Sequence, residues 1–158
     1  MEENFFNNNR ESKIEKDLGV MVRSDLKWDD QVKLATHKAR VSAYSLAKVL
    51  ISKEKEVWSS LFKTFVRPHI EYASMAWLPS QAGHIKTLES VQRWFTRQIP
   101  GIGRFSREER EELCGLEPVA SRIRRGIVIE TFKLKAGISG ARHDMIEPIA
   151  HEHETRGR

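Results

Sequence analysis

The sequence predicts a mainly α-helical, compact domain of five or six helices preceded by one orphan β-strand. Three observations favour this fold class. Bulky apolar residues recur every three or four positions through most of the chain, which is the period of an amphipathic helix. Prolines and glycines interrupt this pattern where helices would end. A single short stretch alternates apolar and polar residues in the manner of a half-buried strand.

The length of 158 residues fits one domain with a core of its own. We expect a disordered leader over residues 1–15, a helical domain with its strand remnant over 16–138, and a flexible polar tail over 139–158. The lone Cys114 cannot form an internal disulfide, and no run approaches the ~20 apolar residues of a membrane span. The sequence therefore predicts an intracellular protein of the cytoplasm or nucleus, without a membrane segment. It indicates no oligomeric state.

The predicted strand lies near the start of the chain, where Leu18, Val20 and Val22 alternate with polar residues between Lys16 and Arg23. No later segment alternates in this way. A strand requires a partner, so we expect this one to be left over from a sheet whose other strands lie outside the chain. In the isolated chain it should be frayed or paired across a dimer.

The first helix is expected from Asp29 to about Leu50, with Asp29 or Asp30 as its cap. Its core face consists of small and aliphatic residues: Val32, Ala35, Ala39, Ala43, Leu46 and Leu50. A second stripe follows the flank of this helix at spacings of four, three, four and four: Lys33, His37, Arg40, Tyr44 and Lys48. Cations interleaved with an aromatic ring suit phosphate contacts, with Tyr44 as a stacking or sugar contact. An ordinary solvated flank is the alternative interpretation.

The second helix should begin near Ser52 and continue through Phe65 to Pro68, which removes a backbone donor. Proline also disfavours helical dihedrals at the preceding Arg67, so we expect a kink or a new helix start in the interior. Beyond it, Ile70, Ala73 and Trp77 share one face. The expected core cluster combines this region with the next helix: Trp58, Phe62, Phe65, Trp77, Leu88 and Phe95.

A further helix, from about His84 to Ile99, has a clear division of faces. One face is apolar apart from Gln92: Ile85, Leu88, Gln92, Phe95 and Ile99. The opposite face carries three cations and no acid: Lys86, Ser90, Arg93 and Arg97. This stripe is the second candidate for phosphate binding, and a solvated surface is again the alternative.

The last two helices have recognisable start signals. Ser106 and Glu109 form a capping box for a short helix that ends at Gly115, and Pro118 opens a helix that runs to about Gly137. Apolar residues surround the second half of that helix, which predicts either central burial or a docking surface: Val128, Ile129 and Phe132. Its first half carries cations, which are unfavourable at a helix N-terminus and hint at an acidic partner: Arg122, Arg124 and Arg125.

No catalytic constellation is evident. Trp28-Asp29-Asp30 lacks the spacing of a polymerase metal turn and fits a helix cap better. The tail sequence His151-Glu152-His153 and the nearby His143 lack the spacing of a zinc site. We therefore expect no enzyme activity, no catalytic residue, no metal and no cofactor.

Lys and Arg number 27 against 22 Asp and Glu, a mild basic excess that is compatible with a nucleic-acid partner.

One stretch closely resembles a known family. The run Phe65-Val66-Arg67-Pro68-His69-Ile70-Glu71-Tyr72-Ala73-Ser74, with Trp77, is similar to a segment that follows the polymerase motifs in reverse transcriptases of non-LTR (LINE-type) retrotransposons. Further stretches resemble that family in the same order, so that the likeness spans roughly residues 16–138: Asp17-Leu18-Gly19-Val20, Leu26-Lys27-Trp28, Leu88-Glu89-Ser90-Val91-Gln92-Arg93 and Leu113-Cys114-Gly115-Leu116-Glu117-Pro118.

The resemblance implies the thumb and following helices of an RNA-directed DNA polymerase, the region that grips the template–primer duplex without performing the chemistry. It also implies that the strand belongs with a catalytic palm encoded upstream, a possible partner. We expect a non-catalytic, nucleic-acid-binding fragment of this mobile element, with a defined set of contact residues: Lys33, Arg40, Tyr44, Lys48, Lys86, Arg93 and Arg97. The alternative is an inactive retroelement relic or a protein-interaction domain that docks through its last helix.

Overall fold

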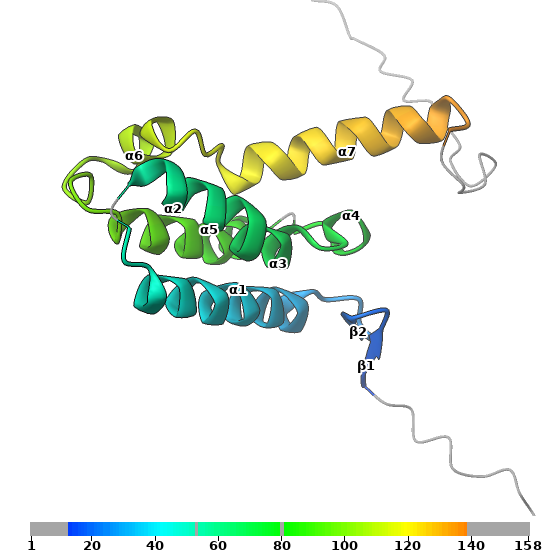
Figure 1. Ribbon diagram of the computed structural model, residues 1–158. Helices are drawn as coiled ribbons and strands as arrows, with labels where there is room; N and C mark the ends of the chain where they lie inside the picture. The colour runs from blue at the N-terminus through cyan, green and yellow to red at the C-terminus, as the bar shows by residue number, and fades with distance from the viewer. Residues whose placement is uncertain (1–12, 53, 80, 139–158) are drawn as a thin grey trace, which may run out of the picture.

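The computed structural model describes residues 13–52, 54–79 and 81–138, and these residues form a mainly helical fold with a small β-hairpin at its N-terminal end (Figure 1). The mainly helical fold class predicted from the sequence is confirmed. The expected tail over 139–158 lies outside the described residues, as does most of the expected leader. Ile14 and Glu15, which the leader included, belong to a strand instead.

The predicted orphan strand has a partner within the chain. Strand β2 (Val20–Arg23) pairs antiparallel with β1 (Ile14–Asp17), with Ile14 opposite Arg23. Leu18 and Gly19 form the turn between them, with φ values of 44° and 88°. Positive φ at both positions matches the twist of a two-residue hairpin, although only glycine adopts it without strain. The prediction missed β1 because this strand is polar and exposed along its whole length.

The hairpin is fastened to the helices, so the expectation of a frayed or dimer-paired strand is wrong. Val20 is buried in the core. The Met21 N–H donates to Gln31 Oε1 over 2.9 Å, and the Tyr72 hydroxyl donates to the Leu18 carbonyl over 2.9 Å. These contacts join the hairpin to the helix that contains Gln31 and to the turn that follows Glu71.

Helix α1 (Asp29–Val49) matches its predicted bounds and buries its small face, including Val32, Ala35, Ala39 and Ala43. Its predicted aspartate cap is wrong. Trp28 occupies the N-cap position, and no side chain caps the helix. The two carboxylates have other partners, because Asp29 contacts His84 at 3.0 Å and Asp30 accepts a hydrogen bond from Arg23 at 3.0 Å.

An uninterrupted helical run follows, made of α2 (Lys55–Leu61), a π-helix η1 (Phe62–Val66) and α3 (Arg67–Glu71). Arg67 keeps helical dihedrals (φ −55°, ψ −41°), so the expectation that Pro68 disfavours them is wrong, although a new α-helix does begin there after the π-helix. The Arg67 N–H donates to the Phe62 carbonyl five residues earlier, which widens the turn. That widening moves the carbonyl of Thr64 away from the ring of Pro68, with which it would clash in a regular α-helix.

The π-helix also changes which aromatic residue enters the core. Phe62, Val66 and Ile70 are fully buried, whereas Phe65 is 51% exposed. Phe65 therefore does not belong to the predicted core cluster, because the extra residue in the turn rotates it toward solvent. The rest of that cluster is buried, and the ring of Phe95 lies 5.2 Å from the rings of both Trp58 and Phe62.

Four further helices follow in the part of the chain that the structure describes. The short α4 (Ser74–Trp77) comes first. Helix α5 (Ala82–Arg97) then runs in the same direction as α1, and the run from α2 to α3 goes in the opposite direction (Figure 1). Helix α6 (Arg107–Leu113) begins with the predicted capping box of Ser106 and Glu109. Helix α7 (Val119–Lys135), with Pro118 at its N-cap, packs its first half against α4 and α5. It lies on the side of the bundle away from α1, and its last turns extend past α4 (Figure 1).

Candidate nucleic-acid interface

The two basic stripes predicted on separate helices lie side by side in the structure. Helices α1 and α5 share the most extensive helix–helix contact of the described residues. Arg40 on α1 donates from Nη2 to Ser90 Oγ on α5 over 3.0 Å. One turn further along, the rings of Tyr44 and Trp94 lie 4.2 Å apart, tilted by 41°. These two contacts join segments about fifty residues apart in the sequence. We call the predicted contact residues of the two helices together the α1/α5 face: Lys33, Arg40, Tyr44, Lys48, Lys86, Arg93 and Arg97.

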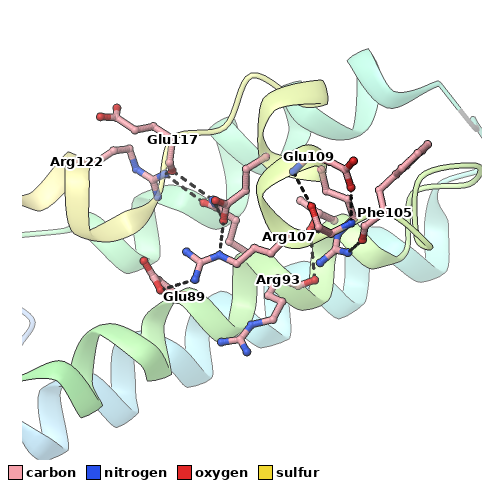
Figure 2. Close-up of polar contacts among 12 residues, drawn as sticks. Glu89, Arg93, Phe105, Arg107, Glu109, Glu117 and Arg122 are labelled. Carbon is pink, nitrogen blue, oxygen red and sulfur yellow. Dashed lines mark hydrogen bonds and ion pairs between the residues drawn. The ribbon is translucent and has the colours of Figure 1, made fainter.

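The residues of the α1/α5 face differ in their exposure to solvent and in their ion pairs. Most are exposed: Lys33, Arg40, Tyr44, Lys48, Lys86 and Arg97. Lys33 lies 3.8 Å from the carboxylate of Asp30 in an exposed ion pair, which contributes little to stability. Arg93 is half-buried, and its Nε is buried without a hydrogen-bond partner. Figure 2 shows its guanidinium directed away from the neighbouring polar network.

Few carboxylates neutralise this face. Within the part of the chain that the structure describes, Lys48, Lys86, Arg93 and Arg97 have no carboxylate within 4 Å. The nearest acid on α5, Glu89, is buried and pairs with Arg107 Nη1 at 3.0 Å (Figure 2). The positive charge of the α5 stripe is therefore left for an external anion.

A buried polar network fixes α5 in place behind the face (Figure 2). Arg107 bridges Glu89 and Glu111 at 3.0 Å each, and the side-chain amide of Gln92 donates to Glu111 over 2.9 Å. Beside it, Arg110 is buried and donates to Thr96 Oγ1 over 3.2 Å. In the sequence, only the i,i+4 spacing of Arg107 and Glu111 indicates a contact of this network.

Two of the three cations at the start of α7 have acidic partners inside the chain, so for these two the expectation of an external acidic partner is wrong. Arg122 is buried and donates from Nε to Glu71, while its Nη1 donates to Gln92 Oε1 over 3.1 Å. Arg125 pairs with Glu117. Arg124 alone of the three stays exposed without a carboxylate among the described residues.

The second half of α7 is not buried centrally. Val128, Ile129 and Phe132 are 68%, 45% and 66% exposed, which is the exposed alternative of the two that the sequence left open. We call these three residues the α7 patch.

The described residues contain no group of three or more His, Cys, Asp or Glu side chains arranged to hold a metal ion. Cys114 is buried, and burial raises the pKa of its thiol above the ordinary value, so it stays protonated at neutral pH.

None of the helices described by the structure has the length and apolar character needed to cross a membrane.

Searches with the whole chain find no matching protein-family model, no matching curated protein and no matching solved structure.

Proposed function

We propose that this chain is a non-catalytic, thumb-like module of an intracellular retrotransposon reverse transcriptase that grips the template–primer duplex. The observation that carries the proposal is the junction of the two basic stripes through the Arg40–Ser90 hydrogen bond. A single stripe opposite a core is where solvated charges normally lie. Two stripes that meet across a helix–helix contact instead form a continuous cationic surface, as a polyanion requires.

The spacing of the cations supports backbone contacts. Successive cations of the α1 row, Lys33, Arg40 and Lys48, are seven and eight residues apart, or roughly 10–12 Å along a helix. The α5 row runs parallel to it, so cations are distributed along the length of the face. Contacts of this kind position a duplex without reading its sequence, so we expect slight sequence preference. The half-exposed ring of Tyr44, which packs against Trp94 at a tilt, adds a flat surface for a sugar or base.

The class of nucleic acid comes from the resemblance of residues 65–77 to the segment after the polymerase motifs of non-LTR reverse transcriptases. In that family the duplex is an RNA–DNA template–primer, and the catalytic palm lies upstream. We therefore propose that this module acts together with a palm and performs no chemistry itself.

The test is the salt dependence of binding to a fluorescently labelled RNA–DNA hybrid, measured by anisotropy from about 50 to 200 mM salt. Each phosphate contacted by a cation contributes about −0.9 to the log–log slope, so the six cations of the face give at most about −5. Replacing Lys86, Arg93 and Arg97 with glutamine should flatten the slope by about three units. A matched variant that replaces exposed cations elsewhere, Arg104, Arg124 and Lys135, should leave the slope nearly unchanged.

Circular dichroism of both variants should give melting temperatures close to that of the wild type, because exposed charges contribute little to folding and the half-buried Arg93 forms no ion pair among the described residues. Absence of binding at about 50 mM salt would refute the proposal. Equal slopes for the α5 variant and the wild type would also refute it.

A second candidate function is protein docking through α7, for an inactive retroelement relic or an interaction domain. The exposed α7 patch favours it, because a contiguous apolar surface on a helix commonly marks an interaction site. Replacing Val128 and Phe132 with serine should leave nucleic-acid binding unchanged under the first function. A loss of hybrid binding in this variant would contradict the assignment of binding to the α1/α5 face.

A further inference from the structure

We propose that a groove between α3–α4 and α7 binds a carboxylate carried by an apolar peptide segment of a partner. The groove encloses about 380 Å³ and is lined by Arg67, Glu71 and Met75 on one side and by Arg122 and Ile129 on the other. This inference goes beyond nucleic-acid binding, and it gives the second candidate function a defined ligand.

Arg122 lines this groove and has one hydrogen-bond donor without a partner. Its side chain is only 5% exposed, and its Nε and Nη1 are occupied by Glu71, Gln92 and the Glu117 carbonyl. Its Nη2 is equally buried but has no hydrogen-bond partner. A buried guanidinium N–H without an acceptor is costly, so an oxygen ligand that reaches it is bound favourably. Guanidinium groups match carboxylates in geometry as well as charge.

The charge of the groove selects a single negative charge. Three guanidinium groups and two carboxylates line it, which leaves one positive charge: Arg67, Arg122, Arg125, Glu71 and Glu130. The carboxylates already bind cations, since Glu71 accepts from Arg67 and Arg122, and Glu130 pairs with Lys133. One added carboxylate balances the groove, whereas a polyanion would also meet the negative charge of Glu71 and Glu130.

The apolar walls define the rest of the ligand. The thioether of Met75 on α4 lies against α7 at Gly126, where a Cβ would be 2.9 Å from Met75 Cε. One turn further on, Ile129 both lines the groove and belongs to the exposed α7 patch. A peptide whose carboxylate reaches Arg122 can therefore place a neighbouring apolar side chain on Ile129 and Phe132. The α1/α5 face plays no part in this site.

The experiment uses the full chain labelled with ¹⁵N and two peptide probes, N-acetyl-Leu-Leu with a free carboxylate and the same dipeptide as its C-terminal amide. We expect the carboxylate probe to shift the Nε–Hε signal of Arg122 and the backbone signals of Gly126 and Ile129. The amide should bind at least about tenfold more weakly, because it lacks the charge that the guanidinium recognises. Sodium acetate and inorganic phosphate, at matched ionic strength, are further arms, and both should bind more weakly than the carboxylate peptide.

Two variants separate recognition from folding. Arg122→Lys keeps the positive charge but lacks the planar fork, so the preference for carboxylate over amide should fall to near unity. Ile129→Ser, at a half-exposed position, should weaken both peptides several-fold while leaving the amide spectrum of the bundle intact. The second variant keeps the test decisive if the first fails to fold.

Equal binding of the two peptides would overturn the proposal, as would tighter binding of phosphate than of the carboxylate peptide. Shifts confined to the α1/α5 face would overturn it too. The two proposals fail separately, because the glutamine variant of Lys86, Arg93 and Arg97 should bind the carboxylate peptide as the wild type does.

Discussion

The π-helix predicts a large difference between two phenylalanines that sequence periodicity places on the same face. Phe62 is fully buried and packs against the ring of Phe95 at 5.2 Å, whereas Phe65 is 51% exposed. Truncating a buried phenylalanine to alanine costs about 3–5 kcal/mol, through lost transfer free energy and the cavity left behind. We expect Phe62→Ala to fall in that range. Phe65→Ala should cost about 1 kcal/mol, because half of the side chain is already in water.

Urea unfolding followed by far-ultraviolet circular dichroism measures both free energies. The slope of the transition should be the same for the wild type and both variants, which shows that the extent of unfolding is unchanged. A third variant, Val66→Ala, checks that the π-helix packs against the core, because Val66 is fully buried. It should cost at least about 1 kcal/mol, from the loss of about two buried methyl groups.

Similar losses for Phe62→Ala and Phe65→Ala would mean that both rings are buried and that the helix continues in ordinary α register. The reasoning about Pro68 would then be wrong.

Three further results are expected. Trp77→Ala should lower the free energy of unfolding in urea by about 3–5 kcal/mol, because Trp77 is fully buried. Trp94→Ala should lower it less, because Trp94 is half-buried. Equal losses would show that α5 is rotated from its observed position. Deleting residues 1–24 should lower the free energy of unfolding by at least about 1 kcal/mol, because the hairpin buries Val20; an unchanged value would show that it is not docked. Burial raises the pKa of the Cys114 thiol above its unfolded-state value of about 8.5, so its contribution to the free energy of unfolding is fully present below that pH and should fall as the pH rises above it. Cys114→Ala should remove this pH dependence in urea titrations at pH 7 and 9.5. An unchanged dependence would contradict burial of the thiol.

The helices were predictable where burial follows a regular period. In α5, Leu88, Gln92 and Phe95 were placed on the core face from spacing alone, and all three are buried. The same logic failed at Phe65, because a π-helix adds one residue to a turn and breaks the period on which the prediction depends. It failed again at β1, since a strand exposed on both faces has no apolar alternation to detect.

The parts of the candidate sites differ in the same way. The two basic stripes were visible as patterns within single helices, but their contact depends on the packing of α1 against α5, which no local pattern encodes. Arg122 was correctly noted as misplaced for a helix N-terminus, yet its partner Glu71 lies 51 residues earlier in the sequence. A charge pair at that separation can be inferred from a single sequence only after the fold is known.

Gln92 connects the two sides of the molecule. It is almost completely buried on α5, where its amide accepts from Arg122 and donates to Glu111. An apolar residue would fill the space but remove one hydrogen-bond partner from each of these charged groups, whereas glutamine can act as donor and acceptor at once. The helix that carries the basic stripe is thus held by the same side chain that orients Arg122 at the groove. The polar residue on the apolar face of α5, which looked like an exception to the helical pattern, therefore has a physical reason: it holds the guanidinium at the groove and the basic stripe in fixed positions on one rigid helix.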